Sequence, residues 1–385
     1  MSRAEKTRLT LCPPLGSFAP METTEHGALH LVGGFLGAGK STAIVAAARL
    51  LSGRGRRVGI VTNDQGKYLV DTGFAAASSV PTVEVTGGCF CCNYGDFRDV
   101  LDRLEERSRP EVVFAESVGS CADLVATVIK PFLELEDAGI AVRSFSVFAD
   151  ARLLSRWVRG LPLPFSGNVT YLYGKQLEEA GLIVINKSDL LTPADGEGLL
   201  ALTARRFPDK QLRLQSSLTE AEITRWLDAL EAQAGSMPLH SLDIDYGTYG
   251  AGEADLAWYD AALRLRFPRG HGGDAARAAV EAVRKAVLDA GVPVGHVKFL
   301  LQHADGDVKV SMTAEDDGRM EGIPRIRGEQ ADLTVNARVQ APAPALRALM
   351  HAALEEGAHG ADAGIEFLQE DCFHPGFPRP THRLG

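Results

Sequence analysis

The sequence predicts an α/β fold with two parts: a larger domain built on a mostly parallel sheet flanked by helices, and a smaller C-terminal α+β domain. From Leu29 onward, apolar stretches alternate with amphipathic ones, as in "ALHLVGGF", "STAIVAAARLLSGRG" and "RVGIVTND". This alternation is typical of parallel strands connected by helices. The chain has 385 residues, whereas a single hydrophobic core stops growing at roughly 250 to 300. We therefore expect two domains.

The larger domain is expected to span residues 28–235, after a flexible N-terminal tail of residues 1–27. The three segments quoted above provide its first strand, a helix and a second strand. Further strands are predicted at Thr82–Thr86, Glu111–Ala115, Arg143–Ala149 and Leu182–Asn186, and further helices at Phe97–Ser108, Lys175–Ala180 and Glu220–Ala234. Residues 236–257 are expected to form a linker, because the segment is rich in glycine and acidic residues and shows no helical period.

The smaller domain is expected at residues 258–370. Its pattern predicts a strand, a helix, three strands, a helix and a last strand. These elements are Trp258–Phe267, Asp274–Ala290, Gly295–Gln302, Val308–Thr313, Asp332–Val339, Ala343–Glu356 and Gly364–Gln369. Their order favours a ferredoxin-like sandwich with both helices on one face of the sheet. Residues 371–385 are read as a C-terminal tail.

The composition excludes several classes of function. The net charge of -10 provides no positive field for binding nucleic acid or an anionic membrane. The longest apolar runs are much shorter than the roughly 18 residues of a membrane-spanning helix. The six cysteines are clustered and unevenly spaced, unlike a disulfide framework, which favours a reducing compartment and hence the cytoplasm.

A phosphate-binding loop is predicted at residues 34–41, "GFLGAGKS", between a strand and a helix. Its glycines permit the positive φ angles that turn backbone N–H groups toward a phosphate, and the helix N-terminus adds its dipole. Lys40 provides a charge for the β- and γ-phosphates, and Ser41 is placed to bind Mg²⁺. The alternative is a glycine-rich turn with a chance lysine. The predicted nucleotide contacts in this loop are Gly34, Gly37, Ala38, Gly39, Lys40, Ser41 and Thr42.

The segment "LIVINKSD" predicts which base is bound. An apolar strand leads into Asn186, Lys187 and Asp189. The carboxylate of Asp189 can accept hydrogen bonds from N1–H and the amine of guanine, whereas adenine offers no such pair of donors. GTP is therefore favoured over ATP. Asn186 is expected to touch the base edge and Lys187 to pack along the ring or brace the phosphate loop. The alternative is a strand end capped by Asn and Asp.

Two further strand ends carry acids. Glu116, in "EVVFAESVG", is expected to hold Mg²⁺ through water or to orient the attacking water, because ligands of open α/β sheets bind at the carboxyl ends of strands. Gly119 lets the backbone approach the γ-phosphate, unless it is an ordinary turn glycine. Asp64 ends the preceding strand next to Asn63 and is expected near the metal in a mobile switch segment.

Three cysteines fall within four positions in "TGGCFCCNYGDF". Cys89 and Cys91 share one face of an extended segment, and the turn at Cys92 brings in a third sulfur. Converging thiolates suit Zn²⁺, Co²⁺ or Cu(I) rather than Mg²⁺. A tetrahedral ion needs a fourth ligand, for which Asp64, Glu116 or a water are candidates. The alternatives are small buried side chains or a redox pair.

In this order, "GGFLGAGKST", "TNDQG", "GGCFCC", "ESVG" and "NKSD" resemble the motifs of the CobW-type metallochaperone GTPases, relatives of UreG and HypB. The resemblance covers about Leu29–Leu191. It implies a P-loop GTPase of low turnover that binds Zn²⁺ or Co²⁺ and couples its nucleotide state to metal delivery to a client metalloprotein, with a homodimer as one expected assembly. It also implies that Cys89, Cys91 and Cys92 bind the metal, that Lys40, Ser41 and Thr42 contact phosphate and Mg²⁺, and that Asn186, Lys187 and Asp189 bind guanine.

The chain departs from that family in two places. Many members have Asn-Glu-Phe-Gly where this chain has Asn-Asp-Gln-Gly at residues 63–66. Many also have a histidine-rich linker, whereas the linker here contains only His240, so storage of several ions there is not expected. A zinc reservoir or sensor with a structural nucleotide is the alternative function, and a kinase acting on a small molecule is a second one.

A second group of soft ligands lies near the C-terminus, in "CFHPGFPRPTH". Cys372, His374 and His382 form either a second metal site or part of a solvated tail, and the group lacks a fourth ligand. Cys12, Cys121 and His271 are read as structural or incidental.

Overall fold

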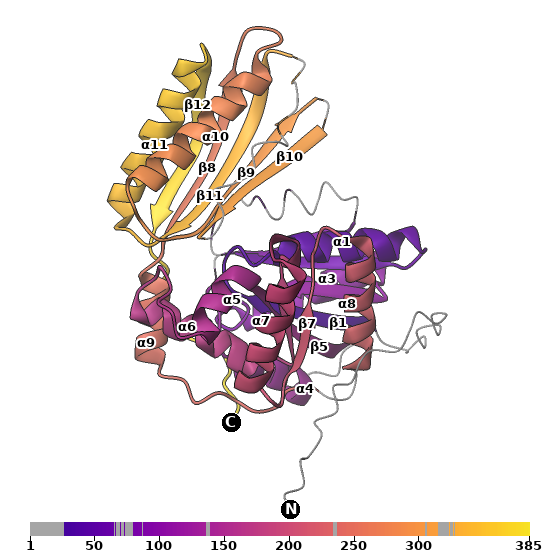
Figure 1. Ribbon diagram of the computed structural model, residues 1–385. Coiled ribbons are helices and arrows are strands. Elements are labelled where there is room, and N and C mark those ends of the chain that lie inside the picture. Colours follow the sequence, from indigo (N-terminus) through magenta and orange to yellow (C-terminus); the bar gives the residue numbers. More distant parts are fainter. Residues whose placement is uncertain are drawn as a thin grey trace, which may run out of the picture.

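The computed structural model describes residues 27–64, 66, 70, 73, 80–86, 88–135, 139–233, 237–304, 306–314, 323, 326 and 328–385. Two sheets organise this part of the chain, one of seven strands and one of five (Figure 1). None of its helices is long and apolar enough to cross a membrane.

The larger sheet has the strand order β3-β2-β4-β1-β5-β6-β7, and neighbouring strands pair in parallel throughout. Its strands are β1 (Gly27–Gly34), β2 (Val58–Asp64), β3 (Thr82–Thr86), β4 (Val112–Glu116), β5 (Ile140–Asp150), β6 (Leu182–Asn186) and β7 (Gln211–Leu214). The predicted parallel α/β sheet is confirmed. Because all strands run the same way, the residues that follow them gather along one edge of the sheet.

Helices cover both faces of this sheet (Figure 1). On one face lie α1 (Lys40–Gly53) and α8 (Glu220–Ala232), where the buried Trp226 packs against the rings of Phe114 and Phe148. On the other face, a larger core takes in side chains of α3 (Tyr94–Ser108), α5 (Ala151–Val158), α6 (Gly167–Glu179) and α7 (Pro193–Arg206). A π-helical turn, η1 (Val125–Ile129), leads into α4 (Lys130–Leu135), and a short 3-10 turn, η2 (Ser188–Leu190), follows β6.

Helices α4, α5 and α7 were not predicted from the sequence, and α6 and α9 differ from the prediction in an instructive way. Helix α6 begins at Gly167, eight residues before the predicted start, because Ser166 caps it by accepting a hydrogen bond from the backbone N of Val169. The segment expected as an irregular linker contains α9 (Tyr246–Ala254), capped by Asp245. Its glycines allow close packing rather than marking a loop: a Cβ on Gly252 would lie 2.7 Å from the carbonyl oxygen of Asn168, at the start of α6.

The smaller sheet is antiparallel, with the order β10-β9-β11-β8-β12. Two helices, α10 (Gly272–Asp289) and α11 (Ala343–Gly360), cover one face (Figure 1). Leaving out the edge strand β10, the order along the chain is the β-α-β-β-α-β of the ferredoxin-like motif, as predicted. The strands are β8 (Ala257–Arg266), β9 (Val294–His303), β10 (Gly306–Thr313), β11 (Gln330–Val339) and β12 (Gly364–Phe373).

The smaller sheet touches the phosphate loop. A Cβ built on Gly295 of β9 would lie 2.6 Å from the Leu36 side chain, and one built on Gly37 would lie 2.4 Å from Cγ2 of Thr313, at the end of β10. The side chain of Trp258, at the start of β8, is buried in the core of the larger sheet. The second unit therefore packs directly on the loop that is predicted to hold phosphate.

The C-terminus returns to the larger sheet and is not a solvated tail. Figure 1 shows the chain leaving β12 and ending on the far side of the first unit. We call residues 378–385 the C-terminal strap. Its attachment is fixed by hydrogen bonds, among them one from the backbone N of Leu384 to the carbonyl oxygen of Ala126 (2.9 Å) and one from Ser241 Oγ to the carbonyl oxygen of Leu384 (2.7 Å).

Candidate functional site

The phosphate loop has the backbone that its glycines predict. Gly34, Gly37 and Gly39 have φ angles of 122°, 73° and 92°, in the region that favours glycine. A Cβ on Gly34 would lie 2.2 Å from the carbonyl oxygen of Phe148, and one on Gly39 would lie 2.3 Å from Nδ2 of Asn186. Both conformation and space therefore require glycine in this loop, and the loop leads directly into α1.

Lys40, Ser41 and Glu116 meet at the end of β1 and β4, as predicted. The ammonium of Lys40 donates to the carbonyl oxygens of Gly34 (2.7 Å) and Phe35 (3.3 Å) and lies 3.9 Å from Oε1 of Glu116. Ser41 Oγ donates to the same carboxylate oxygen at 3.0 Å. A hydroxyl and a carboxylate side by side are the oxygen ligands that Mg²⁺ prefers, so these two residues fit the ion that accompanies a nucleotide.

The loop after β4 lies close to the phosphate loop. A Cβ on Gly119 would lie 2.6 Å from Cδ2 of Leu36, so glycine allows this loop to pack against the phosphate loop. Its approach to the γ-phosphate stays a prediction. Thr42 follows Ser41 in the first turn of α1, half-buried. Asp64 is the last residue of β2, but its side chain lies outside the described residues.

In the predicted base site, Asn186 forms hydrogen bonds with the phosphate loop and with Ser217. The amide nitrogen of Asn186 donates to the carbonyl oxygen of Ala38 (2.8 Å), and its oxygen accepts from the N and Oγ of Ser217 (3.1 and 2.8 Å). Asn186 is buried, and these hydrogen bonds connect it to the phosphate loop and satisfy its polar atoms. Its contact with the base edge stays a prediction.

Lys187 directly precedes the 3-10 turn η2, and Asp189 lies within it. Lys187 has a positive φ of 64°, and its ammonium lies 2.8 Å from the carboxylate of Asp150, at the end of β5. Asp189 is exposed and accepts a hydrogen bond from Ser216 Oγ at 2.7 Å. An exposed, oriented carboxylate is the group needed for the guanine donors. The sequence prediction did not include Ser216 and Ser217, since two serines after a short strand carry no distinctive pattern.

The three clustered thiols converge between β3 and α3. Sγ of Cys89 lies 2.7 Å from Sγ of Cys91, which lies 3.9 Å from Sγ of Cys92, and the three sulfurs are all within 4.8 Å of one another. With Zn–S bonds of about 2.3 Å, sulfurs around a tetrahedral zinc ion lie about 3.8 Å apart. A movement of about 1 Å would therefore convert this arrangement into a zinc geometry.

The thiols also differ in acidity. Hydrogen bonds from the thiols of Cys121, Cys91 and Cys92 lower the pKa of Cys89 well below its usual value. The contacts of Cys91 with the thiols of Cys121, Cys89 and Cys92 raise the pKa of Cys91. Contact with Cys89 is the main reason that the pKa of Cys92 rises to about 11. Cys89 is therefore the first thiol to become the thiolate that binds a soft metal ion.

Asn63, at the end of β2, fixes the cysteine loop. Its side-chain nitrogen donates to the carbonyl oxygens of Val85 (3.1 Å) and Gly88 (2.7 Å), and its oxygen accepts from the backbone N of Phe90 (3.0 Å). Phe90 then packs on Phe97, with ring centroids 4.3 Å apart. The strand next to β4 thus holds the loop that carries the thiols.

A fourth cysteine lies beside this cluster, although the sequence analysis read it as incidental. Cys121 is 1% exposed and its thiol lies next to those of Cys89 and Cys91 in the same buried core. It lies two residues after Gly119, in the loop that follows β4. The sequence signal for it is that loop: the residues after β4 face the same sheet edge as the residues after β3.

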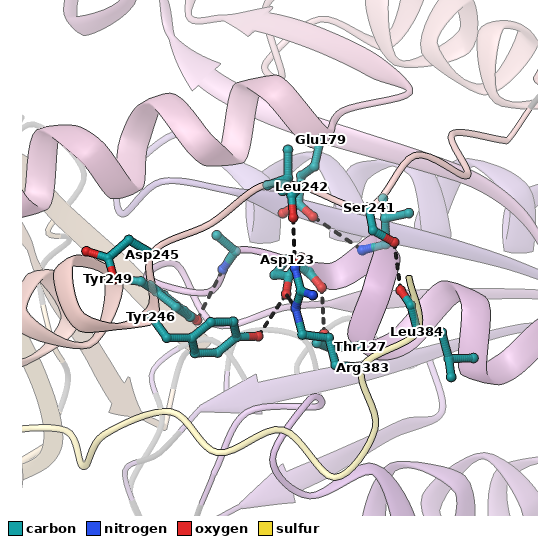
Figure 2. Close-up of polar contacts among 12 residues, drawn as sticks. Asp123, Thr127, Glu179, Ser241, Leu242, Asp245, Tyr246, Tyr249, Arg383 and Leu384 are labelled. Carbon is teal, nitrogen blue, oxygen red and sulfur yellow. Dashed lines mark hydrogen bonds and ion pairs between the residues drawn. The ribbon is translucent and has the colours of Figure 1, made fainter.

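The C-terminal strap lies across the cysteine loop. The backbone N of Arg379 donates to Sγ of Cys92 (3.2 Å), and Thr381 donates through its backbone N to the carbonyl oxygen of Cys91 (2.8 Å) and through Oγ1 to that of Cys92 (3.0 Å). Farther along the strap, the guanidinium of Arg383 donates a hydrogen bond to the carboxylate of Asp123, which also accepts one from the hydroxyl of Tyr246 (Figure 2).

The second group of soft ligands is not assembled. Cys372 donates to the carbonyl oxygen of Ala343, and Nε2 of His374 accepts from the backbone N of that residue. His382 instead packs edge-on against Tyr94, with ring centroids 5.1 Å apart. Among the described residues, Cys89, Cys91 and Cys92 are the group of three or more metal-ligating side chains whose ligand atoms lie together.

Comparison with known proteins finds similarity in the first part of the chain. Residues 28–211 match the profile of the family described as "CobW/HypB/UreG, nucleotide-binding domain". Two curated proteins match over 192 residues each: the zinc chaperone CobW of Sinorhizobium sp, 31% identical over 45% of this chain, and the zinc chaperone YeiR of Escherichia coli, 30% identical over 48% of it. The match covers 53% of each protein, so the chain spans about half the length of these relatives.

Two solved structures also match, at lower sequence identity. One is HypB from Helicobacter pylori in complex with nickel, 14% identical, with a TM-score of 0.41, covering 57% of this chain and 93% of that one. The other is the Zn(II)-bound YjiA GTPase of E. coli, 15% identical, with a TM-score of 0.37, covering 85% of this chain and 98% of that one.

Proposed function

Because residues 28–211 are a nucleotide-binding domain of the CobW/HypB/UreG family, we propose that the protein is a GTP-hydrolysing metallochaperone. It binds GTP with Mg²⁺ at the phosphate loop, binds Zn²⁺ or Co²⁺ as cargo at Cys89, Cys91 and Cys92, and passes the ion to a client metalloprotein. Zn²⁺ is the first choice, because Co²⁺ binds such sites more weakly and both curated relatives are named zinc chaperones. Clustered thiols favour a reducing compartment, and we propose the cytoplasm.

The observation that carries this proposal is the convergence of the thiols at the sheet edge that also carries Lys40 and Glu116. The sulfurs lie within 4.8 Å of one another after β3, and the phosphate loop follows β1. In the strand order β3-β2-β4-β1 these two points are three strand spacings apart, or about 14 Å. That distance is too long for direct contact and short enough for the intervening strand ends to connect the two sites.

Those strand ends provide the physical connection. Glu116 is the last residue of β4, and its carboxylate accepts a hydrogen bond from Ser41 Oγ. Asn63 lies one residue before the end of β2 and forms hydrogen bonds with both sides of the cysteine loop. A change at the γ-phosphate that shifts Glu116 or the segment after β2 therefore changes the geometry of the thiols. GTP hydrolysis is proposed to alter metal affinity through this route, with Lys40 holding the phosphates and Asp64 and Glu116 acting on the metal or the attacking water.

The experiment that tests this function is GTP hydrolysis by the metal-stripped protein, with and without one equivalent of Zn²⁺. We expect zinc to change the rate in the wild type and to have no effect when Cys89, Cys91 and Cys92 are all replaced by serine. Cys372→Ser is the matched control, because this thiol is remote from the cluster and contacts Ala343. A wild-type rate that zinc leaves unchanged would instead support a zinc reservoir with a structural nucleotide.

A further inference from the structure

We propose that Cys121 is a fourth metal ligand, so that the cargo ion is held by four thiolates contributed by two different loops. This inference rests on the proposed metal-binding function and adds a residue to it. Cys89, Cys91 and Cys92 come from the loop after β3, whereas Cys121 comes from the loop after β4. Neither Asp64 nor Glu116 is then needed to complete a tetrahedral site.

The position of the Cys121 thiol supports this assignment. It lies beside the thiols of Cys89 and Cys91, in the same buried core, where all three side chains are at most 2% exposed. The three sulfurs of Cys89, Cys91 and Cys92 already form a metal-ligating group. The Cys121 thiol lies outside that group of three and next to it, so a bound ion would have to draw it in.

The backbone around Cys121 is fixed by hydrogen bonds. Its N–H donates to the carbonyl oxygen of Val118 (3.0 Å), and its own carbonyl oxygen accepts from Nε2 of Gln176 (2.8 Å), which also donates to the carbonyl oxygen of Gly119 (3.0 Å). The next residue, Ala122, donates to the hydroxyl of Tyr249 (3.3 Å). The backbone of the turn is therefore held next to the cluster, which favours Cys121 as a ligand because little of the turn has to be ordered on binding.

The other candidates for a fourth ligand are less well placed among the described residues. The carboxylate of Glu116 already accepts from Ser41 and lies 3.9 Å from the ammonium of Lys40, so it belongs to the phosphate site. Thiolate is also the better partner for Zn²⁺ when three thiolates are already present, because four sulfurs form a common tetrahedral zinc site. Each thiol that binds the ion releases its proton to water.

The loop that carries Cys121 connects the metal with the nucleotide. It begins at Glu116, which is hydrogen-bonded to Ser41, and passes Gly119, which lies against Leu36 of the phosphate loop. A shift at the phosphates would therefore move Cys121 relative to the other three thiols. Losing one of four thiolates weakens the site and leaves a coordination position for a ligand from the client. This gives the nucleotide a direct means of releasing the cargo.

The first test needs no variant. X-ray absorption of the full-length wild-type protein loaded with one equivalent of Zn²⁺ reports the number of sulfurs around the metal. We expect four sulfurs at about 2.3 Å. Three sulfurs with one oxygen or nitrogen would overturn the assignment of Cys121 and leave the proposed function standing.

The second test uses Co²⁺ as the probe, because the intensity of its thiolate charge-transfer band follows the number of bound thiolates. We expect Cys121→Ser to lower that intensity by about a quarter and to lower the Zn²⁺ affinity by at least tenfold, as losses around metal sites typically do. Cys372→Ser is the matched control and should match the wild type in both. An unchanged band and affinity in Cys121→Ser would overturn the inference.

Nucleotide dependence separates this inference from the proposed function. We expect the cobalt band of the wild type to differ between the GDP state and a state with a non-hydrolysable GTP analogue, and Cys121→Ser to lose the difference. A difference that persists in Cys121→Ser would contradict the role of this thiol but not the coupling. Cobalt bound equally well by the triple variant of Cys89, Cys91 and Cys92 would contradict the proposed function itself. Cys121→Ala, with thermal unfolding of each variant, distinguishes loss of a ligand from loss of folding.

Discussion

The guanidinium Nε of Arg383 lies 2.7 Å from Oδ2 of Asp123, a carboxylate with no exposed side-chain surface. The two residues are 260 positions apart, so this ion pair attaches the end of the chain to the loop after β4. The hydroxyl of Tyr246 donates to the same oxygen at 2.7 Å, and Nη2 of Arg383 donates to the carbonyl oxygen of Leu242 (Figure 2). Asp123 follows Cys121 by two residues, and the strap also contacts Cys91 and Cys92. The strap therefore joins the two loops that carry the thiols.

We expect Arg383→Ala to lower the free energy of unfolding by about 3 kcal/mol, because it leaves a buried carboxylate without its cation. The figure is at the lower end of the range for buried pairs, since Arg383 is 37% exposed on its side chain and Tyr246 still donates. Denaturant titration measures the change. Arg379→Ala is the control, because Arg379 contacts Cys92 through its backbone. Adding Asp123→Asn to Arg383→Ala should recover part of the loss; no recovery would contradict the ion-pair explanation.

Asn63→Ala should weaken zinc binding by about tenfold, a typical cost of losing a residue that orients metal ligands. The substitution removes two donated hydrogen bonds and one accepted bond that hold the cysteine loop. Asn63→Asp should have an intermediate effect, because its carboxylate still accepts from the backbone N of Phe90. Competition with a zinc chelator gives the affinities. Zinc binding of Asn63→Ala that equals the wild type would show that the loop holds its shape without this residue.

Gly37→Ala is expected to weaken nucleotide binding by roughly tenfold, since a left-handed conformation costs a non-glycine residue about 1 to 2 kcal/mol. The φ angle at this position is 73°, and the added Cβ would also lie 2.4 Å from Cγ2 of Thr313. Titration with a fluorescent GTP analogue measures the loss. Thr313→Ala in the same protein removes the clash but not the backbone strain, so it should restore binding only in part. Complete restoration would mean that contact with the smaller sheet, and not strain, is the cause.

His30 should make the protein sensitive to acid. Burial, with a smaller effect of Arg143, lowers the pKa of this histidine from 6.5 to about 4. The unfolded chain therefore binds a proton between pH 6.5 and 4 that the folded protein does not bind. The stabilisation is present above pH 6.5 and is lost as the pH falls toward 4, by about 3 kcal/mol in total. His30→Gln should lose less stability than the wild type between pH 7 and pH 4 in denaturant titrations; equal losses would contradict this assignment.

The sequence predicted most of the larger sheet because its strands are short apolar runs that end at recognisable motifs. The strands Thr82–Thr86 and Leu182–Asn186 were predicted to the residue, and the phosphate loop was placed between its strand and helix. Helix α9 was missed because its glycines, which serve close packing on α6, look locally like a loop. Packing of this kind depends on residues far apart in the sequence and leaves no local pattern.

The candidate site was likewise predicted only in part. The sequence alone predicted that Cys89, Cys91 and Cys92 lie together, because neighbours in sequence cannot be far apart in space. Cys121 lies 29 positions after Cys92 in the sequence, and Arg379 of the strap lies about 290 positions after it. Only the folded order of the strands shows that both lie next to the cysteine loop. The hydrogen bond from Asn186 to the carbonyl oxygen of Ala38 was not predicted, since the motif does not reveal which way the amide points.

The central claim is that nucleotide state and metal affinity are coupled, and the most direct test is the Zn²⁺ affinity of the full-length protein with bound GDP and with a non-hydrolysable GTP analogue. Competition with a chelating dye gives both values under the same conditions. We predict a difference of at least about fivefold, the lower limit of typical coupling between two sites, and an equal effect of zinc on nucleotide affinity. The same Zn²⁺ affinity in both nucleotide states would contradict the account.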